Sequence, residues 1–307
     1  MKLVCSKSNL LTGLQVVSKA VPNKTTMSIL ECILIDSTSG EIKLTANDME
    51  LGIETIIEGE ILEKGIIALD AKIFLEIVRK LPDNDITITT DSNFKTAITC
   101  EKAKFNIIGK SGEDFSYLPM IERNESIIIS QYTLKEVIRQ TIFSISDNDN
   151  NKLMSGELFE INGEEMRVIS LDGHRISIRK IHLKNSYPAK KVVVPGKTLN
   201  EISKILSGDA DKDVTIFFTD KHIVFEFENT TVVSRLIEGE YFKIDQMLSS
   251  DYETKVIIHK KELLDCIDRA TLLIKEGDKK PIIINITDGS MELKINSTVG
   301  SMDEEID

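Results

Sequence analysis

The chain has 307 residues, of which 41% are hydrophobic and 29% charged, and its net charge at pH 7 is −12. This composition is typical of a globular protein of two or three domains, no apolar run is long enough to cross a membrane, and the acidic balance argues against a surface that binds nucleic acid everywhere. Four widely spaced cysteines argue against a disulfide framework or a structural zinc site and favour buried thiols in a cytoplasmic protein.

The first predicted elements are a short β run, KLVC, a helix over residues 8–20, and an alternating hairpin, GEIKLTANDMELGI. Apolar residues recur at three- and four-residue intervals in the helix and at every second residue in the hairpin, as expected for elements with one buried face. This stretch is therefore predicted to fold as strand, helix and strands.

The second stretch, GIIALDAKIFLEIVRKLPDNDITITT from Gly65, has the same order of elements. Asp70 stands where an N-cap belongs, before a predicted helix over residues 71–81. The apolar residues of that helix predict one buried face: Ile73, Phe74, Ile77, Val78 and Leu81.

The pattern then recurs along the rest of the chain. The run SIIIS precedes a predicted helix over 134–145, with Thr133 as its N-cap, and the hairpin EEMRVISLDGHRISI. The run KVVVP precedes a helix over 197–206, and KVIIH precedes a helix over 260–273 and the hairpin SMELKINSTVGSMDEEI. Equivalent apolar positions in the three hairpins are Ile42, Met166 and Leu293, and two residues later Leu44, Val168 and Ile295.

These repeats predict an α+β fold with two complete domains, 1–122 and 126–247, and the first half of a third, 253–307. Because two strand–helix–strands modules make one domain and the sequence predicts five, we expect a chain that lacks the C-terminal half of its third domain. The five predicted helices carry more basic than acidic residues, although the chain as a whole is acidic. A shared helical surface would therefore favour phosphate, but Lys and Arg are also good helix formers on solvated faces, and charge alone leaves both interpretations open.

Six blocks in order along the chain resemble the bacterial replicative sliding clamps, the beta subunits of DNA polymerase III. They are SNLLTGLQVVSKAV, TTMSILECILI, LDAKIFLEIVRKLPDNDITI, FNIIGKSGEDFSYLP, GELFEINGEEMRVISLDGHRISI and VVSRLIEGEYFKIDQML. The resemblance implies the DNA-clamp fold and a head-to-tail homodimeric ring, with helices around a central hole and sheets outside. Such a ring encircles double-stranded DNA without sequence preference and tethers the polymerase for processivity, with no catalysis, cofactor or metal.

The resemblance also implies which residues meet DNA. Lys24 precedes TTMSIL, where the family has a basic residue, and Lys152 falls in a family loop that touches DNA. Helical face and charge add seven more: Lys72, Arg79, Lys80, Lys135, Arg139, Lys197 and Lys204. The alternative for each is an ordinary solvated side chain.

In the family, the segment that matches SLDGHRISI lies beside a hydrophobic cleft. The cleft binds short linear peptides from the polymerase, the clamp loader and repair proteins. The matching positions here are Met154, Leu171, Gly173, His174, Arg175, Ile176, Phe242, Gln246 and Met247. Gly173 permits a tight turn, and the two methionines offer adaptable apolar contact.

A homodimer contact is implied in the same way by Phe105 and Ile107 on one strand and by Leu272 and Leu273 at the end of the last helix. The alternative is that all four belong to ordinary intradomain cores.

Two further classes of function compete with a clamp. Asp172 and His174 could serve a metal-dependent hydrolase, but no H-E-x-x-H helix, phosphate-binding loop or nucleophile elbow accompanies them. A β-rich ligand-binding module unrelated to DNA is the other alternative, and it would not distinguish circular from linear DNA.

Overall fold

The structure is a computed structural model that describes residues 1–146, 151–248, 251–275, 277 and 279–306. These residues form two compact units, Met1–Tyr241 and Phe242–Asp307. No helix in the described ranges is long and apolar enough to span a membrane.

The first unit begins with one strand–helix–strands repeat and a second module of the same kind. The elements are β1 (Lys2–Ser6), α1 (Lys7–Val17), η1 (Ser18–Ala20), β2 (Cys32–Asp36), β3 (Ile42–Asn47), β4 (Leu51–Ile57), β5 (Glu60–Glu63), β6 (Ile66–Asp70), α2 (Ala71–Lys80), β7 (Asp85–Thr90), β8 (Lys95–Cys100), β9 (Ala103–Ile108), β10 (Lys110–Ser111) and η2 (Gly112–Asp114). Ser6 and Asp70 cap the two helices, each through a side chain that accepts a backbone N–H from the first turn.

The same order of elements returns in the rest of this unit. The elements are β11 (Ser126–Ser130), α3 (Gln131–Thr141), η3 (Ile142–Ser144), η4 (Lys152–Ser155), β12 (Gly156–Leu171), β13 (Ile176–Pro195), α4 (Gly196–Ile205), β14 (Asp213–Phe218), β15 (His222–Phe227) and β16 (Thr230–Arg235). The predicted equivalence of the hairpins is confirmed, because Ile42 and Met166 are both buried, as are Leu44 and Val168.

One antiparallel sheet runs through both repeats. Its nine strands lie in the order β10-β6-β2-β3-β4-β16-β15-β14-β11, beside a five-stranded sheet, β5-β1-β7-β8-β9, and the β12-β13 pair. The two repeats meet where β4 pairs with β16, with Ile53 opposite Val232 and Thr55 opposite Thr230. The predicted domains 1–122 and 126–247 therefore share a sheet, and the division between them stays a prediction.

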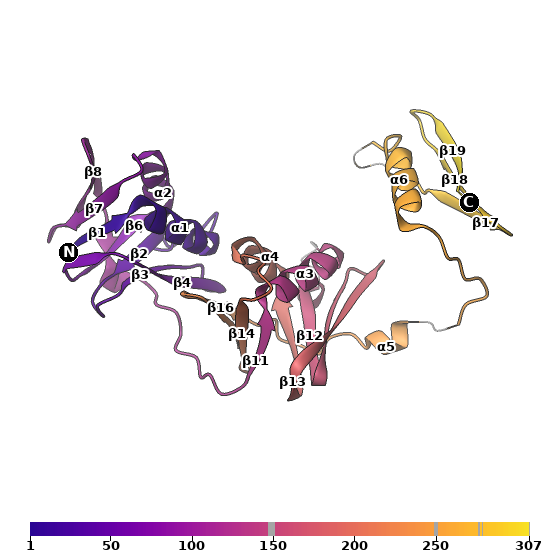
Figure 1. Cartoon of the computed structure of the whole chain (residues 1–307), viewed down its shortest axis with the longest axis horizontal. Coiled ribbons are helices and arrows are strands. Elements are labelled where there is room, and N and C mark those ends of the chain that lie inside the picture. The colour runs from indigo at the N-terminus through magenta and orange to yellow at the C-terminus, as the bar shows by residue number, and fades with distance from the viewer. Residues whose placement is uncertain (147–150, 249–250, 276, 278, 307) are drawn as a thin grey trace. The chain divides into compact units, whose positions relative to one another are not determined.

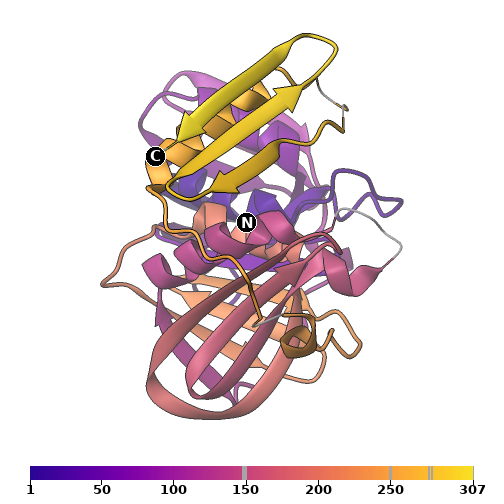
Figure 2. The same ribbon diagram turned by 90° about the vertical axis from the view of Figure 1, so that its right-hand side faces the viewer.

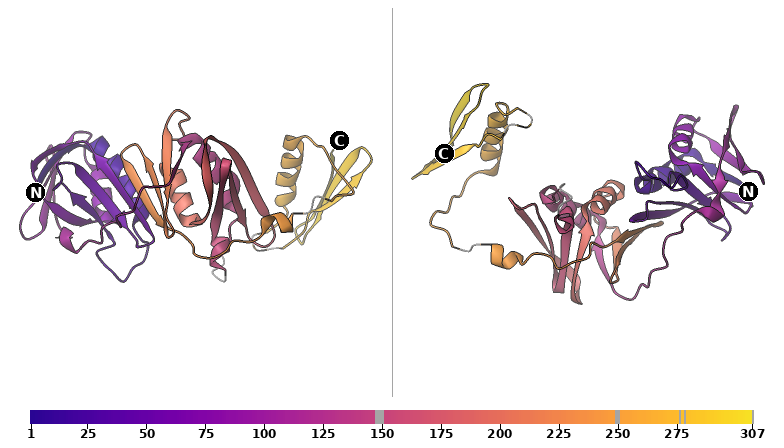
Figure 3. Two further views of the ribbon diagram at one scale, coloured as in Figure 1. Left: turned by 90° about the horizontal axis from the view of Figure 1, so that it is seen from below. Right: turned by 180° about the vertical axis from the view of Figure 1, so that it is seen from behind.

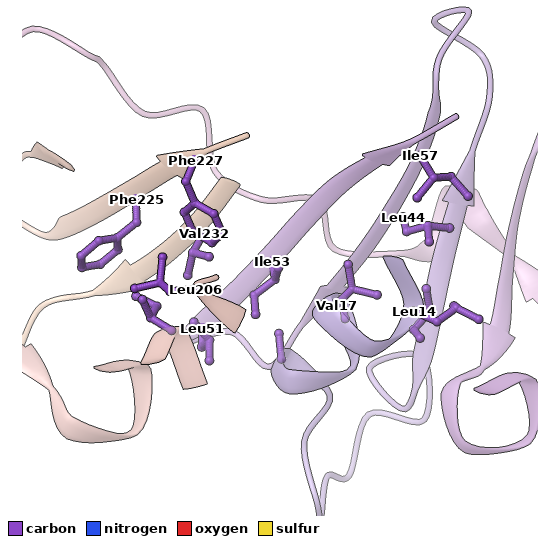
Figure 4. Close-up of a cluster of buried hydrophobic side chains, with 14 of the residues drawn as sticks. Leu14, Val17, Leu44, Leu51, Ile53, Ile57, Leu206, Phe225, Phe227 and Val232 are labelled. Atoms are coloured by element: carbon purple, nitrogen blue, oxygen red, sulfur yellow. The ribbon is translucent and has the colours of Figure 1, made fainter. Parts of the chain in front are cut away.

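A continuous hydrophobic core follows this junction. Figure 4 shows its side chains on both sides of the β4–β16 pair: Leu14, Val17, Leu44, Leu51, Ile53 and Ile57 from the first repeat, and Leu206, Phe225, Phe227 and Val232 from the second. The helices α1 to α4 lie along the same side of the shared sheet (Figures 1 and 3). Each helix packs its apolar face against strands of its own repeat, α1 against β3 and β4, and α3 and α4 mainly against the β12–β13 pair. Figure 1 shows both helix pairs on one surface.

The second unit is smaller. It contains α5 (Ile244–Met247), α6 (Lys260–Thr271), β17 (Ile283–Thr287), β18 (Ser290–Asn296) and β19 (Ser301–Ile306). The strands form one antiparallel sheet in the order β17-β18-β19, and α6 packs against it (Figure 2). Cys266 of the helix contacts a core made by Met291, Leu293 and Ile306.

Four details of the sequence-based prediction are wrong. The N-cap of α3 is Ser130, whose hydroxyl accepts the N–H of Thr133, so the helix begins earlier than predicted. Ile73 points away from the core and is 52% exposed. The run KVIIH at 255–259 is not a strand, since no described strand of its unit pairs with it, and the short α5 was not predicted.

One core position differs in chemistry between the repeats. The β2–β6 and β12–β13 pairs share a register, which places Glu157 where the first repeat has Ile33. Both side chains are fully buried, and within the described residues neither carboxylate oxygen of Glu157 has a hydrogen-bond partner. Burial raises the pKa of Glu157 to about 8, an effect that the nearby Thr141 hydroxyl partly opposes.

Glu157 should make the stability of the first unit fall as pH rises. The folded-state pKa lies above the unfolded value of about 4.3, so the proton is held in the fold and lost on unfolding between these two values. The contribution of this proton to stability is fully present below about pH 4. It declines by about 1.4 kcal/mol per pH unit up to the folded pKa near 8. We therefore expect Glu157→Gln to gain stability over the wild type progressively between pH 5 and pH 8.

Urea unfolding of both proteins at these two pH values measures this difference. Glu58→Gln, a change at an exposed glutamate, is the matched control and should show no such trend. A Glu157→Gln effect of the same size at both pH values would contradict the account.

Candidate functional site

The segment Asp172–Arg175 is a tight turn between β12 and β13. The Oδ1 atom of Asp172 accepts the backbone N–H groups of His174 at 3.0 Å and Arg175 at 3.1 Å. Gly173 takes a φ of +89°, a conformation that L side chains rarely adopt. The Asp side chain thus replaces a backbone acceptor and holds the turn closed.

The first repeat makes the same turn between β3 and β4. There the Oδ1 atom of Asp48 accepts the N–H groups of Glu50 at 3.0 Å and Leu51 at 2.6 Å, and Met49 has a φ of +76°. Because an aspartate closes this turn at both equivalent positions, the aspartate is part of the fold. Asp172 is therefore explained by turn formation without any catalytic or metal-binding role.

The electrostatics of Asp172 agree with this role. The N–H of His174 above all, and then the N–H and guanidinium of Arg175, lower the pKa of its carboxyl. A carboxylate that accepts these hydrogen bonds is a weaker base than a free one. No group of three potential metal ligands occurs in the described part of the chain.

The turn also fixes Arg175. Its Nε donates to Oδ2 of Asp172 at 3.0 Å, and its guanidinium lies 5.6 Å from the centre of the Phe143 ring. The ring is 55% exposed. Phe143 was not among the predicted site residues, because the sequence placed it inside a longer helix, whereas α3 ends at Thr141 and η3 turns the ring toward Arg175.

The other predicted cleft residues of the first unit differ in exposure. Met154 lies in η4 and is half-buried, with its carbonyl accepting the N–H of Ser146 at 2.8 Å. Ile176 begins β13 and is half-buried, and His174 is exposed. Leu171 is fully buried, so its side chain belongs to the core.

Three predicted cleft residues belong to the second unit. Phe242 is half-buried, and its carbonyl accepts the N–H of Ile244 at the start of α5. Gln246 and Met247 lie on that helix and are exposed.

The predicted DNA-facing residues fall into two groups. Lys24, Lys72 and Lys80 are exposed, and no acidic group of the described residues lies within ion-pair distance of them. Lys152 is exposed and begins η4, next to residues 147–150, which lie outside the described residues.

The second group is already engaged within the chain. Arg139 pairs with Glu136 at 2.7 Å, Lys204 with Glu201 at 2.7 Å, and Arg79 with Glu76. The ammonium group of Lys135 donates to the Leu206 carbonyl at 2.9 Å, where α4 ends. Lys197 pairs with Asp48 and thereby links α4 to the turn of the first repeat. Such pairs reduce the positive charge that these side chains offer to a phosphate.

The predicted dimer contacts lie at an edge strand and at a helix end. β9 is the last strand of the five-stranded sheet, with Phe105 41% exposed and Ile107 packed against the core. Its Ile108 is 83% exposed and was not predicted. In the second unit, Leu272 is 80% exposed just after α6, whereas Leu273 is half-buried.

Comparison with known proteins identifies the family of the chain. Residues 1–119 match the N-terminal domain of the DNA polymerase III beta subunit, and residues 128–243 match its central domain. The beta sliding clamp of Staphylococcus aureus is 34% identical over 316 residues, covering 100% of this chain and 84% of that protein. The chain belongs to the bacterial beta sliding clamp family.

Solved structures agree. A putative DNA polymerase III beta subunit from Eubacterium rectale is similar with a TM-score of 0.98 and 77% identity, covering 100% of this chain and 84% of that one. The DNA polymerase sliding clamp of Bacillus subtilis has a TM-score of 0.95 and 33% identity, covering 100% and 83%. The predicted α+β clamp fold is confirmed.

The protein is a DNA sliding clamp of DNA polymerase III, a processivity factor and not an enzyme. The predicted function is confirmed, and the metal-dependent hydrolase is not supported. The residues assigned to DNA, peptide and dimer contacts stay predictions.

Substitutions of Gly173 test whether the backbone conformation of the turn requires glycine. A Cβ added there would meet no atom within 4 Å, so Gly173→Ala should cost only the strain of a positive φ, about 1 kcal/mol. Gly173→Asn should cost less, because Asn tolerates this conformation better.

The measurement is the free energy of unfolding in urea of the wild type and of the Ala and Asn variants. Equal stability of the Ala variant and the wild type would contradict the strain argument, as would an Asn variant less stable than the Ala variant.

Proposed function

We propose that the chain acts as a protomer of a head-to-tail homodimeric ring that encircles duplex DNA in the cytoplasm. The helices α1 to α4 face the DNA, and the sheets face outward. The observation that carries this proposal is the shared sheet, since the β4–β16 pair keeps the helices of two repeats on one side.

The helical side suits a ring that moves along DNA. A ring holds DNA by topology, so its inner wall needs only weak contacts to phosphate that carry no sequence information. Internal ion pairs of Arg79, Arg139 and Lys204 moderate the positive charge of this side. Lys24, Lys72 and Lys80 are then the side chains best placed for phosphate contacts.

The proposed peptide cleft centres on Arg175. Its guanidinium is fixed on one side by Asp172 and on the other by the Phe143 ring, so it is ordered before a peptide arrives. Met154, in η4, offers an adaptable apolar surface. Family resemblance adds His174 and Ile176 of the same unit, and the partners would be short linear peptides of the polymerase, clamp loader and repair proteins.

The proposed dimer contact uses the outer edge of β9 and the end of α6. In the described residues β9 pairs only with β8, which leaves a strand edge with an exposed Phe105 and Ile108. Natural proteins rarely leave such an edge uncovered. A second protomer would cover it, and the exposed Leu272 is the proposed partner side chain.

Retention on circular DNA tests the ring. Protein loaded by a clamp loader onto a nicked circular plasmid should elute with the plasmid from a sizing column, and a single cut that linearises the plasmid should release it. Retention that survives linearisation would contradict encirclement, as would equal binding to linear and circular DNA.

Salt-dependent binding of variants to linear duplex DNA tests the assignment of the lysines. Lys72→Gln/Lys80→Gln should weaken binding to linear duplex at low salt and reduce the slope of log K against log[salt] by up to about 0.9 for each phosphate that the variant no longer neutralises. Lys204→Gln, the control, should change it less because Lys204 is already paired. Equal effects of the two variants would contradict the division into free and engaged lysines.

A further inference from the structure

The second unit has apolar side chains exposed on a strand edge, on its long helix and in the run before that helix. β17 is an edge strand, and within the described residues it pairs with β18 alone. Ile283 and Ile284 of this strand are exposed, as is Leu264 of α6. Before the helix, Val256 and Ile257 are exposed, the latter at 89%. An exposed apolar strand edge is a site at which a further strand can add.

The first repeat shows what covers the equivalent elements there. It consists of two modules, one from β1 to β4 and the other from β6 to β9. Each module gives its first strand to the sheet of the other, since β1 pairs with β7 and β6 pairs with β2. The resulting sheets include the orders β4-β3-β2-β6 and β9-β8-β7-β1. This reciprocal exchange relates the two modules by an approximate two-fold axis.

The described part of the second unit contains one module of this kind. The run 255–259 leads into α6, and β17, β18 and β19 follow, in the order that β1, α1, β2, β3 and β4 have in the first module. The run therefore stands in the place of β1, whose partner β7 belongs to the other module. A single extended segment without a partner strand is not stable, which explains why this run is not a strand here.

The exposed side chains fit one another as an antiparallel pair of strands. Ile258 packs against the core of the unit, and Val256 lies two residues before it, on the same side of an extended chain. Just before β17, Ile282 packs against the same core, so Ile284 faces that side too. One antiparallel register joins these positions and makes three apolar pairs: Val256–Ile284, Ile257–Ile283 and Ile258–Ile282.

One module does not form these pairs with itself. In the first module, β1 and β2 lie in different sheets. The three pairs therefore join two modules. A two-fold axis that brings the run 255–258 of one copy to β17 of a second copy also brings the second copy's run to β17 of the first.

The same axis covers the exposed leucine of the helix. Leu264 is the fifth residue after the N-cap of α6, as Leu11 is after the N-cap of α1. Leu11 packs against the core of the first unit, where α1 lies beside α2. In a pair of second units, the α6 helix of the other copy takes the place of α2.

We propose that two copies of this chain associate through their second units and thereby form the arrangement that two modules make in the first repeat. The run 255–258 of each copy adds as a strand to β17 of the other, and the two α6 helices pack together. The contact is isologous and ends at two copies, unlike the head-to-tail contact of the ring. It uses neither β9 nor Leu272, so it does not rest on the proposed ring.

A second copy covers all of these side chains at once. A lone peptide strand on β17 would cover Ile283 and Ile284 but leave Val256, Ile257 and Leu264 in water. The second copy carries both halves of the contact, and its apolar residues are already in register. Each of the three apolar pairs is then made twice, which favours the symmetric dimer.

Disulfide formation between two single-cysteine variants tests this contact. Ile257→Cys and Ile283→Cys change exposed side chains, and the native cysteines are buried and react slowly. Residues directly opposite in an antiparallel pair have Cα atoms about 4.5 to 5.5 Å apart, which suits a disulfide. Under a mild oxidant, a mixture of the two variants should form a disulfide-linked dimer in up to about half of the chains, because the copies pair at random. Neither variant alone should do so, because the two copies of either position would lie in different sheets, as β1 and β6 do.

Two controls define the register and the apolar contact. Thr287→Cys in place of Ile283→Cys lies on the same side of β17 but about 13 Å further along the strand, and should give only background cross-linking. Ile284→Asp in both partners should lower the yield at least about tenfold, because a carboxylate would then lie opposite Val256 without a polar partner. Val299→Asp, at an exposed position between β18 and β19, should leave the yield unchanged.

Three results would overturn the proposal. They are equal yields from the Ile283→Cys and Thr287→Cys mixtures, no disulfide from either mixture, and equal effects of Ile284→Asp and Val299→Asp. A second unit covered by any other module or protein gives no disulfide, because position 257 of one copy then stays away from position 283 of another. The circular-plasmid assay is a separate test, because the proposed ring contact involves neither position.

Discussion

The pairing of β4 with β16 is the constraint on which the rest of the first unit depends. Thr55 and Thr230 exchange a buried hydrogen bond at 2.9 Å across it, and Ile53 lies opposite Val232 in the core. Without this pair, no sheet would join the two repeats, and each pair of helices would belong to a separate body. With it, four helices share one surface, and a function that needs a continuous helical side becomes possible.

A single turn design is used for two purposes. In the first repeat, the carboxylate of Asp48 closes a turn and also pairs with Lys197, which strengthens the junction between the repeats. In the second repeat, Asp172 closes the same turn and holds Arg175 at the surface. A residue pattern that suggests catalysis is therefore explained by backbone geometry, and its function is to present a side chain.

Periodicity and repetition made most of the fold predictable from the sequence. The equivalent residues Met166 and Leu293 are buried as predicted, and Asp70 caps its helix. Thr133 was misassigned because Ser130 lies one helical turn earlier with the same hydrogen-bonding chemistry. The β4–β16 pair was not predicted, because pairing between distant strands leaves no local signal in either strand.

The sites were less predictable than the fold. Family resemblance indicated the turn at Gly173, but the contact of Phe143 with Arg175 depends on where α3 ends, which periodicity locates only approximately. Net charge could not distinguish free basic side chains from paired ones, because ion pairs such as that of Arg139 with Glu136 are evident only from the positions of the side chains. No local pattern marks Glu157 as a core residue, and its burial is evident only from the structure, where it takes the place of Ile33.

The most direct test of the account is photo-cross-linking to duplex DNA on a closed circle after loading. A cross-linking residue replaces either Lys80 on α2 or Glu226 on β15, whose side chain lies on the opposite face of the strand from Phe225 and Phe227. The account predicts cross-links from position 80 and none from position 226. Cross-links from position 226, with position 80 silent, would contradict a helical side that faces DNA.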